Sequence, residues 1–460
     1  MDAAAGFSRP WVAFFKDQRV WAYADRLSLR PGERFNVMAS SGPAQPPRRV
    51  RLEVFRLGAA ESTAPVWISA FQDVQYHGAT ASAAAIGPGW PAAFADIDTA
   101  SWRPGVYSAD IVEQTTATRD VRAFQLILTN PRRSGAVLCR LGTNTWQAYN
   151  PWGGHSLYPN GDDENRGVIV TFDRPTAPSL FEYDIHLVRW LESLAADFGG
   201  IDFATNFDVH ADPDLLHSYR LLITGGHDEY WSKEEFDAVE KRIFHAGGNV
   251  CFFGGNTAYC QIRYSDINAA PGSRLLGRQL ICYKTAADPI LSRASAVERT
   301  LLRTSNFRVG ARRPETMLLG GAYQGWFDPA SAQRPPFLVA DDKGPFFRGT
   351  GWKVGDTAAD VVGYEWDNRD PEGDGRRLWD EKQSLIAPID PASVRVLMRG
   401  RPIDAQGRPG LAEATWYRSR AGAKVFNAGT VRWAWGLSKE GFARPGFRRF
   451  NENLVRDMLI

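Results

Sequence analysis

The feature that most constrains the fold is a strand–helix–strand repeat in the middle of the chain. Residues 221–224 are a short apolar run that ends at two glycines, and residues 250–253 repeat this pattern. Between them, Ser232 is followed three residues later by Glu235, the sequence signature of a helix N-terminus. Alternation of buried strands with helices predicts a doubly wound, mostly parallel sheet with helices on both faces.

The segments on either side of this repeat have other patterns. Residues 49–56 and 106–112 alternate polar and apolar side chains with period two, as half-buried strands do. We therefore predict an α/β plus β chain, with an N-terminal β-sandwich over residues 1–132 and an α/β domain over residues 133–460. The stretch from about 264 to 420 is rich in Pro, Gly and Asp, which predicts a long irregular insertion.

Length and charge limit the classes of function. A chain of 460 residues is long enough for two or three domains, and a net charge of +2 gives no electrostatic basis for binding nucleic acid or an acidic membrane. No apolar run approaches the length of a membrane span, and the first 15 residues lack the pattern of a signal peptide. The four cysteines fit no zinc motif. We expect a cytoplasmic protein.

Three loops follow the predicted strands and carry most of the polar chemistry. They span residues 145–154, 225–231 and 254–257, and offer a carboxylate, an imidazole, a carboxamide and a phenol. Open α/β sheets bind ligands beyond the carboxyl ends of their strands, so these loops should be neighbours. No nucleophile elbow and no phosphate-binding glycine motif is present. This leaves water activation, by a metal or by acid–base residues.

These loops resemble those of the N,N-dimethylformamidase large (beta) subunit family. The motifs that carry the resemblance occur in the same order over most of the chain, and they are Gly105-Val106-Tyr107, Ala148-Tyr149-Asn150, Gly226-His227-Asp228-Glu229-Tyr230-Trp231-Ser232, Gly254-Gly255-Asn256 and Tyr364-Glu365-Trp366. The α/β region also resembles the class I glutamine amidotransferase-like fold, without the catalytic cysteine of that fold.

The resemblance implies a mononuclear iron site, with iron expected as Fe³⁺. The family's two tyrosine ligands and one glutamate ligand would correspond here to Tyr107, Tyr149 and Glu229. Glu365 falls where the family places a catalytic carboxylate, and His227 and Asn256 would support the site. Phenolate and carboxylate are hard anionic ligands that suit a ferric ion, which can polarise a carbonyl or activate water.

The expected function is therefore metal-dependent hydrolysis of a small amide, with Glu365 as general base and acid and with His227 or Asn256 stabilising the oxyanion. A homo-oligomer or a separate small subunit is the expected assembly. Two alternatives stay open: a related hydrolase with another metal, and a non-catalytic protein that binds carbohydrate or another small ligand. Each residue also has a structural interpretation. Tyr107 fits a packed strand residue, and Asn256 fits a turn residue with positive φ.

Overall fold

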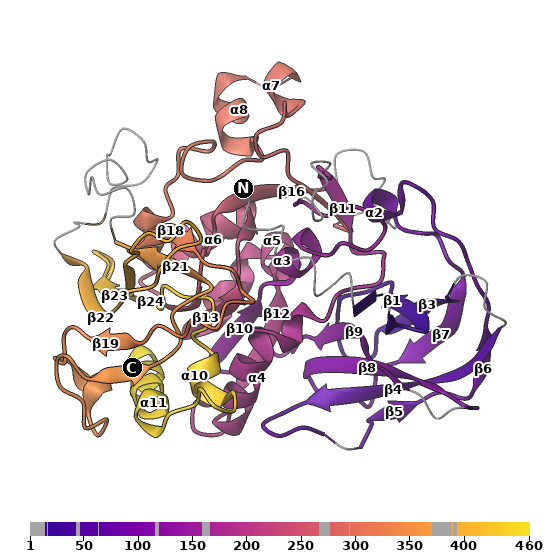
Figure 1. Ribbon diagram of the computed structural model, residues 1–460, viewed down its shortest axis with the longest axis horizontal. Coiled ribbons are helices and arrows are strands. Elements are labelled where there is room, and N and C mark those ends of the chain that lie inside the picture. Colours follow the sequence, from indigo (N-terminus) through magenta and orange to yellow (C-terminus); the bar gives the residue numbers. More distant parts are fainter. Residues whose placement is uncertain are drawn as a thin grey trace.

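The computed structural model describes residues 14–15, 17–42, 47–62, 64–115, 119–158, 166–265, 277–293, 295–369, 389 and 393–460. In Figure 1 the N-terminal strands lie on the right and a large mixed sheet with its helices lies on the left. The first 13 residues, for which we expect no signal peptide, lie outside the described part of the chain. The fold is thus a mixture of helices and several sheets.

The N-terminal region contains two sheets that share one core. The first has the order β1-β3-β7, with β1 at Val20–Ala24, β3 at Arg34–Ser41 and β7 at Ala92–Asp98. The second has the order β2-β9-β8-β4-β5, with β6 also paired to β4; its strands are β2 (Ser28–Leu29), β9 (Arg119–Leu128), β8 (Gly105–Glu113), β4 (Arg48–Leu57), β5 (Trp67–Ile68) and β6 (Gln72–Val74). Period-two alternation directs Val50, Leu52 and Val54 of β4 into the core between these sheets.

A nine-stranded sheet forms the centre of the rest of the chain. Its order is β12-β10-β13-β15-β24-β23-β22-β19-β20. The strands from β12 to β24 pair in parallel, and those from β24 to β20 pair antiparallel. Their bounds are β12 (Ile201–Thr205), β10 (Val137–Leu141), β13 (Leu221–His227), β15 (Asn249–Gly255), β24 (Lys424–Asn427), β23 (Ala412–Arg418), β22 (Arg395–Gly400), β19 (Phe337–Val339) and β20 (Thr357–Ala359).

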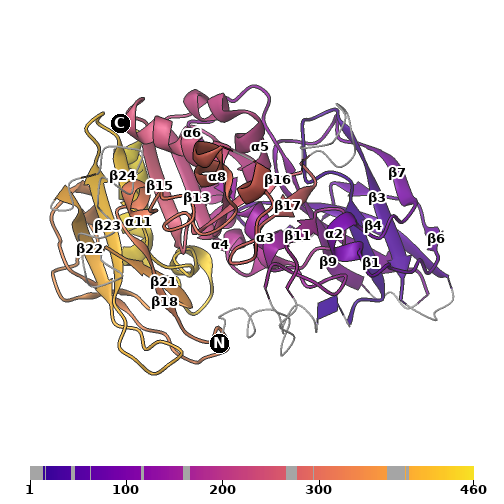
Figure 2. The same cartoon turned by 90° about the horizontal axis from the view of Figure 1, so that it is seen from above.

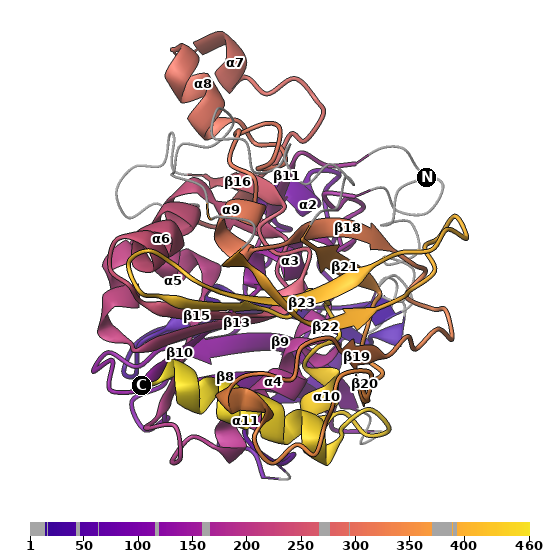
Figure 3. The ribbon, with the colours of Figure 1, turned by 90° about the vertical axis from the view of Figure 1, so that its left-hand side faces the viewer.

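Helices cover both faces of the parallel strands, as Figure 3 shows. Alternate residues of β15 face opposite sides: Phe252 packs in the cluster with α6 (Lys233–Phe244), whereas Phe253 packs in the cluster with α4 (Asp184–Ser193) and α11 (Pro445–Met458). The remaining helices are α2 (Ala83–Ile86), α3 (Thr143–Ala148), α5 (Asn206–Ala211), α7 (Ile290–Arg293), α8 (Ala296–Leu302), α9 (Thr316–Leu319), α10 (Trp435–Ser438) and the 3₁₀ turns η1 (Ser179–Phe181), η2 (Pro213–Ser218) and η3 (Pro345–Phe347). Within the described ranges, no helix combines the length and apolarity needed to cross a membrane.

The stretch predicted as an irregular insertion is more regular than expected. It contributes β19, β20, β22 and β23 to the nine-stranded sheet, although parts of residues 264–420 lie outside the described ranges. It also contributes β17 (Gln279–Ile281) to a sheet with β11 (Ile169–Thr171), β16 (Cys260–Tyr264) and β14 (Tyr230–Ser232). A two-stranded sheet pairs β18 (Ala322–Trp326) with β21 (Glu365–Asn368). The prediction of irregular structure was wrong here because short antiparallel strands depend on distant partners rather than on local pattern.

Candidate active site

The candidate site lies at the carboxyl ends of three neighbouring parallel strands. Tyr149 caps the C-terminus of α3, the short helix that follows β10. His227 is the last residue of β13, with Glu229 just beyond it, and Asn256 follows the last residue of β15. Figure 2 shows β13 and β15 side by side, with α3 near their ends. The structure therefore brings the three predicted loops together.

A glycine lets the helix α4 approach this edge. Gly226 has a φ of +65°, which an L-residue with a side chain adopts only with strain. A Cβ atom at Gly226 would also lie 2.6 Å from Oδ1 of Asp184, the first residue of α4. This close packing places Asp184 and the preceding Tyr183 beside His227.

Two phenols converge on the carboxylate of Glu229. The Tyr149 hydroxyl donates to Oε2 of Glu229 at 2.8 Å, and the Tyr158 hydroxyl donates to Oε1. The two tyrosine rings stack with centroids 4.4 Å apart. Cys260 adds a thiol 3.7 Å from Oε1. Glu229 is 1% exposed, so all these donors meet in an interior site.

A second group of polar side chains adjoins the same carboxylate. His227 Nε2 lies 2.9 Å from Oε2 of Glu365 and 3.5 Å from Oε2 of Glu229. Asn256 donates from Nδ2 to Oε2 of Glu365 at 3.1 Å. On the other side of the imidazole, Nδ1 lies 3.2 Å from the Tyr364 hydroxyl. Strand β21 carries Glu365, so the chain far beyond the parallel strands folds back to the site.

Asn256 is both a turn residue and a polar neighbour of Glu365. Its φ of +51° is the left-handed turn conformation expected for an Asn after two glycines. Its backbone N–H donates to Oδ1 of Asp367 at 2.8 Å, which fixes the turn against β21. The turn therefore aims the carboxamide at Glu365.

Tyr107 is not brought to this group. Its position in β8 directs the ring into the core of the N-terminal sheets, where it stacks on Trp102 at a centroid distance of 5.1 Å. Its hydroxyl donates to the backbone carbonyl of Arg103. The physical reason is the alternation of β8, because Val106 and Ser108 face the other side of the sheet. Tyr158 stands beside Glu229 where the sequence led us to expect Tyr107.

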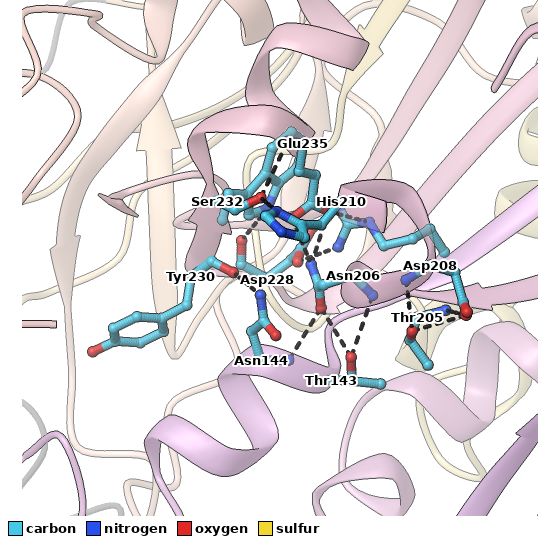
Figure 4. Close-up of polar contacts among 12 residues, drawn as sticks. Thr143, Asn144, Thr205, Asn206, Asp208, His210, Asp228, Tyr230, Ser232 and Glu235 are labelled. Carbon is cyan, nitrogen blue, oxygen red and sulfur yellow. Dashed lines mark hydrogen bonds and ion pairs between the residues drawn. The ribbon is translucent and has the colours of Figure 1, made fainter. Parts of the chain in front are cut away.

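A buried polar network supports the loop that carries Glu229 (Figure 4). Asn144 donates to the carbonyl of Tyr230, and Asn206 donates to Glu235 at 2.9 Å. Beneath them, Arg140 of β10 pairs with Asp228 and, at 2.9 Å, with Glu235. Ser232 accepts the N–H of Glu235 as the N-cap of α6, as its sequence predicts.

Burial sets the protonation of the phenols and the carboxylate. Burial and then the Glu229 charge raise the pKa values of Tyr149 and Tyr158 well above the ordinary tyrosine value. Burial also raises the pKa of Glu229, while the ammonium of Lys284 opposes this shift. Lys284 Nζ lies 3.2 Å from the centroid of the Tyr158 ring. Without a bound cation, the two phenols therefore stay protonated and share the carboxylate by hydrogen bonding.

The imidazole responds to burial and to its carboxylate neighbours. Burial lowers the pKa of His227, but the charge and hydrogen bond of Glu365 raise it by more. The pKa of His227 is therefore above the ordinary histidine value. The close contact of the imidazole with the Glu365 carboxylate therefore favours the charged form of His227.

A small cavity of about 10 Å³ adjoins Tyr149 and His227. This is room for about one water molecule. Asp184 lines it, and burial raises the pKa of this carboxyl to about 8, opposed by the hydrogen bond from Trp146. At neutral pH Asp184 therefore holds its proton, and its Oδ1 has no hydrogen-bond partner among the described residues.

Tyr158, Asp184 and Lys284 are site residues that the sequence did not indicate, and Tyr364 was named only as part of a motif. Tyr158 lies in an irregular loop, where no period indicates which way a side chain points. Tyr364 is the exception, because it stands next to Glu365 in a motif that the sequence had already singled out.

These features define a buried small-molecule site. Oxygen donors of hard character and an imidazole–carboxylate pair meet in a buried pocket at the carboxyl ends of a parallel sheet, which is where α/β proteins bind small molecules. The chain belongs to the N,N-dimethylformamidase beta subunit-like, C-terminal family, whose model matches residues 51–446. This confirms the resemblance predicted from the sequence motifs. The name of the family is consistent with a separate second subunit. A search of curated proteins found no match.

Proposed function

We propose that the protein is a hydrolase of small amides, and that Tyr149, Tyr158 and Glu229 hold a single iron ion. The observation that carries this proposal is the meeting of both phenol oxygens at the Glu229 carboxylate. The family supports the amide substrate, because it is named for an enzyme of N,N-dimethylformamide.

The residues present fit a hard trivalent cation. Two phenolates and a carboxylate supply three negative charges and oxygen donors, which hard metal ions prefer. In addition, the Asn256 side chain is buried, with 3% of the residue exposed. Its Oδ1 has no hydrogen-bond partner in the described part of the chain. When bound, the ion would supply a Lewis acid that polarises the amide carbonyl.

Residues of the chain would carry out the proton transfers and orient the reacting groups. Glu365 accepts a proton from the attacking water and returns it to the leaving nitrogen, as general base and then general acid. His227 holds the Glu365 carboxylate at 2.9 Å, and Asn256 holds the same oxygen at 3.1 Å, so the carboxylate is oriented before the substrate arrives. The protonated Asp184 faces the small cavity and can donate a hydrogen bond to an oxygen there.

The cavity as it stands holds about one water molecule, so an amide can enter only when the side chains around it move. Tyr149, Tyr183 and His227 surround it, and all three are nearly inaccessible to solvent. Because these walls are buried, a compact amide requires less movement of them than a bulky one.

Metal content and hydrolysis of N,N-dimethylformamide by the purified protein test this proposal together. We expect about one iron per chain, a visible tyrosinate-to-iron absorption band and release of amine from small amides. Glu229→Gln should lose both the iron and the activity, because an amide is a weaker ligand than a carboxylate. Glu298→Gln, a change on the exposed helix α8, should keep both. Colourless wild-type protein that takes up no iron and leaves amides intact would contradict the proposal and favour the non-catalytic binding alternative.

A further inference from the structure

A buried arginine contacts the loop that carries both phenols of the candidate active site. Arg174 follows strand β11, which lies beside α3 in Figure 2. It is fully buried, and among the residues that the structure describes it forms no ion pair. Burial lowers its pKa to about 9, so the guanidinium stays charged at neutral pH. Because a buried cation is unfavourable without partners, the groups that it contacts indicate what it does.

Arg174 donates its hydrogen bonds to one short stretch of chain and to the strand beside it. Nη1 donates to the carbonyls of Trp152 at 2.7 Å and His155 at 2.9 Å, and Nη2 donates to the carbonyl of Gln147 at 3.0 Å. Nε donates to the side-chain oxygen of Gln147 at 3.3 Å and to the carbonyl of Thr171 at 3.1 Å. The rigid fork of the guanidinium thus fixes several points of a single loop against the end of β11.

The same loop carries Tyr149 and Tyr158. Tyr149 lies between the first two of these contact points, and Tyr158 lies three residues after the last. The N–H of Leu157 donates to the carbonyl of Ala148 at 2.9 Å, which joins the two ends of the loop. The path of the loop therefore sets where the two phenols lie relative to Glu229.

The sequence of the loop gives it little preference for this path. Gly153 and Gly154 have φ values of +83° and +95°, and glycine adopts many other conformations at low cost. Contacts to the rest of the chain must therefore select the observed path. Asn150 supplies one, since its Nδ2 donates to the carbonyl of Pro175 at 2.8 Å, and the neighbouring Arg174 supplies the others described above.

We propose that Arg174 is a positioning residue for the two phenols. Its guanidinium fixes residues 147–158 in the path that directs Tyr149 and Tyr158 at Glu229, where they can bind one cation together. It acts through the loop, because its hydrogen bonds go to the loop and to β11 rather than to the phenols. The identity of the cation as iron rests on the proposed function.

Arg242 of α6 offers a matched control. It is 3% exposed, and burial lowers its pKa to about 10. Its guanidinium also donates to backbone carbonyls, which are those of Leu216, Tyr219, Arg220 and Asn249. These carbonyls lie just before β13 and at the first residue of β15, at the opposite end of the parallel strands from the site. Lysine in place of either arginine keeps the charge and loses the fork.

Iron titration of the wild-type chain, Arg174→Lys and Arg242→Lys tests the proposal, with urea unfolding of each protein measured in parallel. Both variants should be less stable than wild type. Only Arg174→Lys should bind iron about 10–100-fold more weakly and shift the visible absorption band, as expected when support behind metal ligands is removed. Unchanged iron affinity in Arg174→Lys would overturn the proposal, and so would an equal loss of affinity in Arg242→Lys.

Hydrogen exchange of the metal-free proteins gives a readout that does not depend on iron. Backbone amides of residues 147–158 should exchange faster in Arg174→Lys than in wild type or Arg242→Lys, and unchanged exchange would overturn the proposal. Wild-type protein that takes up no iron would contradict the proposed function, and exchange would then decide whether Arg174 positions the loop.

A milder variant covers the case in which Arg174→Lys does not fold. Gln147→Met removes the side-chain oxygen that accepts from both Arg174 and Asn150. It should weaken iron binding by a smaller factor and speed exchange in the same segment. Unchanged affinity and unchanged exchange in Gln147→Met would overturn the proposal.

Discussion

His227 is held at both of its ring nitrogens. Nε2 faces Glu365 at 2.9 Å and Nδ1 faces the Tyr364 hydroxyl at 3.2 Å. A buried imidazole fixed in this way keeps one orientation, so the carboxylate it contacts is fixed as well. In the proposed hydrolysis, Glu365 would therefore be an acceptor of fixed position for the proton of the attacking water.

Replacement of Glu365 by Gln should separate metal binding from catalysis. Glutamine keeps the size of the side chain and can still accept the Asn256 hydrogen bond, but it cannot take up a proton. We expect Glu365→Gln to keep its iron and its colour and to lose about 10²–10⁴-fold in the rate of amide hydrolysis. Metal analysis and a steady-state assay measure the two effects. Loss of iron in this variant would instead make Glu365 a ligand.

His186 of α4 should make the free energy of unfolding depend on pH. Burial, with the nearby charges of Lys439 and Arg189, lowers the pKa of this imidazole to about 4 from its usual 6.5. The unfolded chain therefore binds more protons than the folded chain between about pH 6.5 and 4, so this stabilisation is present above pH 6.5 and is lost as the pH falls.

The variant His186→Gln cannot titrate in this window. The difference in unfolding free energy between wild type and variant should shrink by about 2 kcal/mol from pH 7 to pH 4, after allowance for solvent screening. Urea unfolding at each pH measures it, with the exposed His217→Gln as control. A difference that stays constant across this range would show that His186 is not buried in its neutral form.

At the scale of elements, β10, β13 and α6 are joined by buried charges rather than by apolar packing alone. Arg140, Asp228 and Glu235 are all 1% exposed or less. Burial raises the pKa of Glu235 to about 8, against the opposing charge of Arg140. The guanidinium thus holds the loop that carries Glu229 against the strand behind it.

Arg140→Met should therefore destabilise the fold strongly. Removal of the guanidinium leaves buried acidic groups without their cation, which costs about 3–5 kcal/mol. Arg408→Met, which breaks an exposed pair with Asp404, should cost no more than about 1 kcal/mol. Denaturant unfolding of both variants gives the comparison. Equal losses of stability would mean that the buried network contributes little.

The elements also show what local pattern can and cannot predict. The ends of β13 and β15 could be predicted because apolar runs that stop at paired glycines are local signals, and these ends position His227 and Asn256. The strands β19, β20, β22 and β23 could not, because each is stabilised by partners distant in sequence. Tyr158 was missed for a related reason. Its loop has no helical or strand periodicity, so the sequence does not indicate which way the side chain points.

At the scale of the whole molecule, the N-terminal sheets and the nine-stranded sheet meet without sharing the candidate site. Arg56 of β4 forms a bidentate ion pair with Glu192 of α4, at 2.7 and 3.2 Å, across their contact. Tyr107 remains inside the N-terminal core. The proposed ligands all belong instead to the loops of the mixed sheet, so the N-terminal sheets contribute none of them.

The iron content of Tyr158→Phe and Tyr107→Phe, measured together with visible absorbance, tests this account most directly. Each change removes one hydroxyl: the first donates to Glu229 and the second to the carbonyl of Arg103. We predict that Tyr158→Phe loses the iron and the visible band, while Tyr107→Phe keeps about one iron per chain. The reverse result, an iron-free Tyr107→Phe and a coloured Tyr158→Phe, would contradict the assignment of Tyr149, Tyr158 and Glu229 as the metal-binding set.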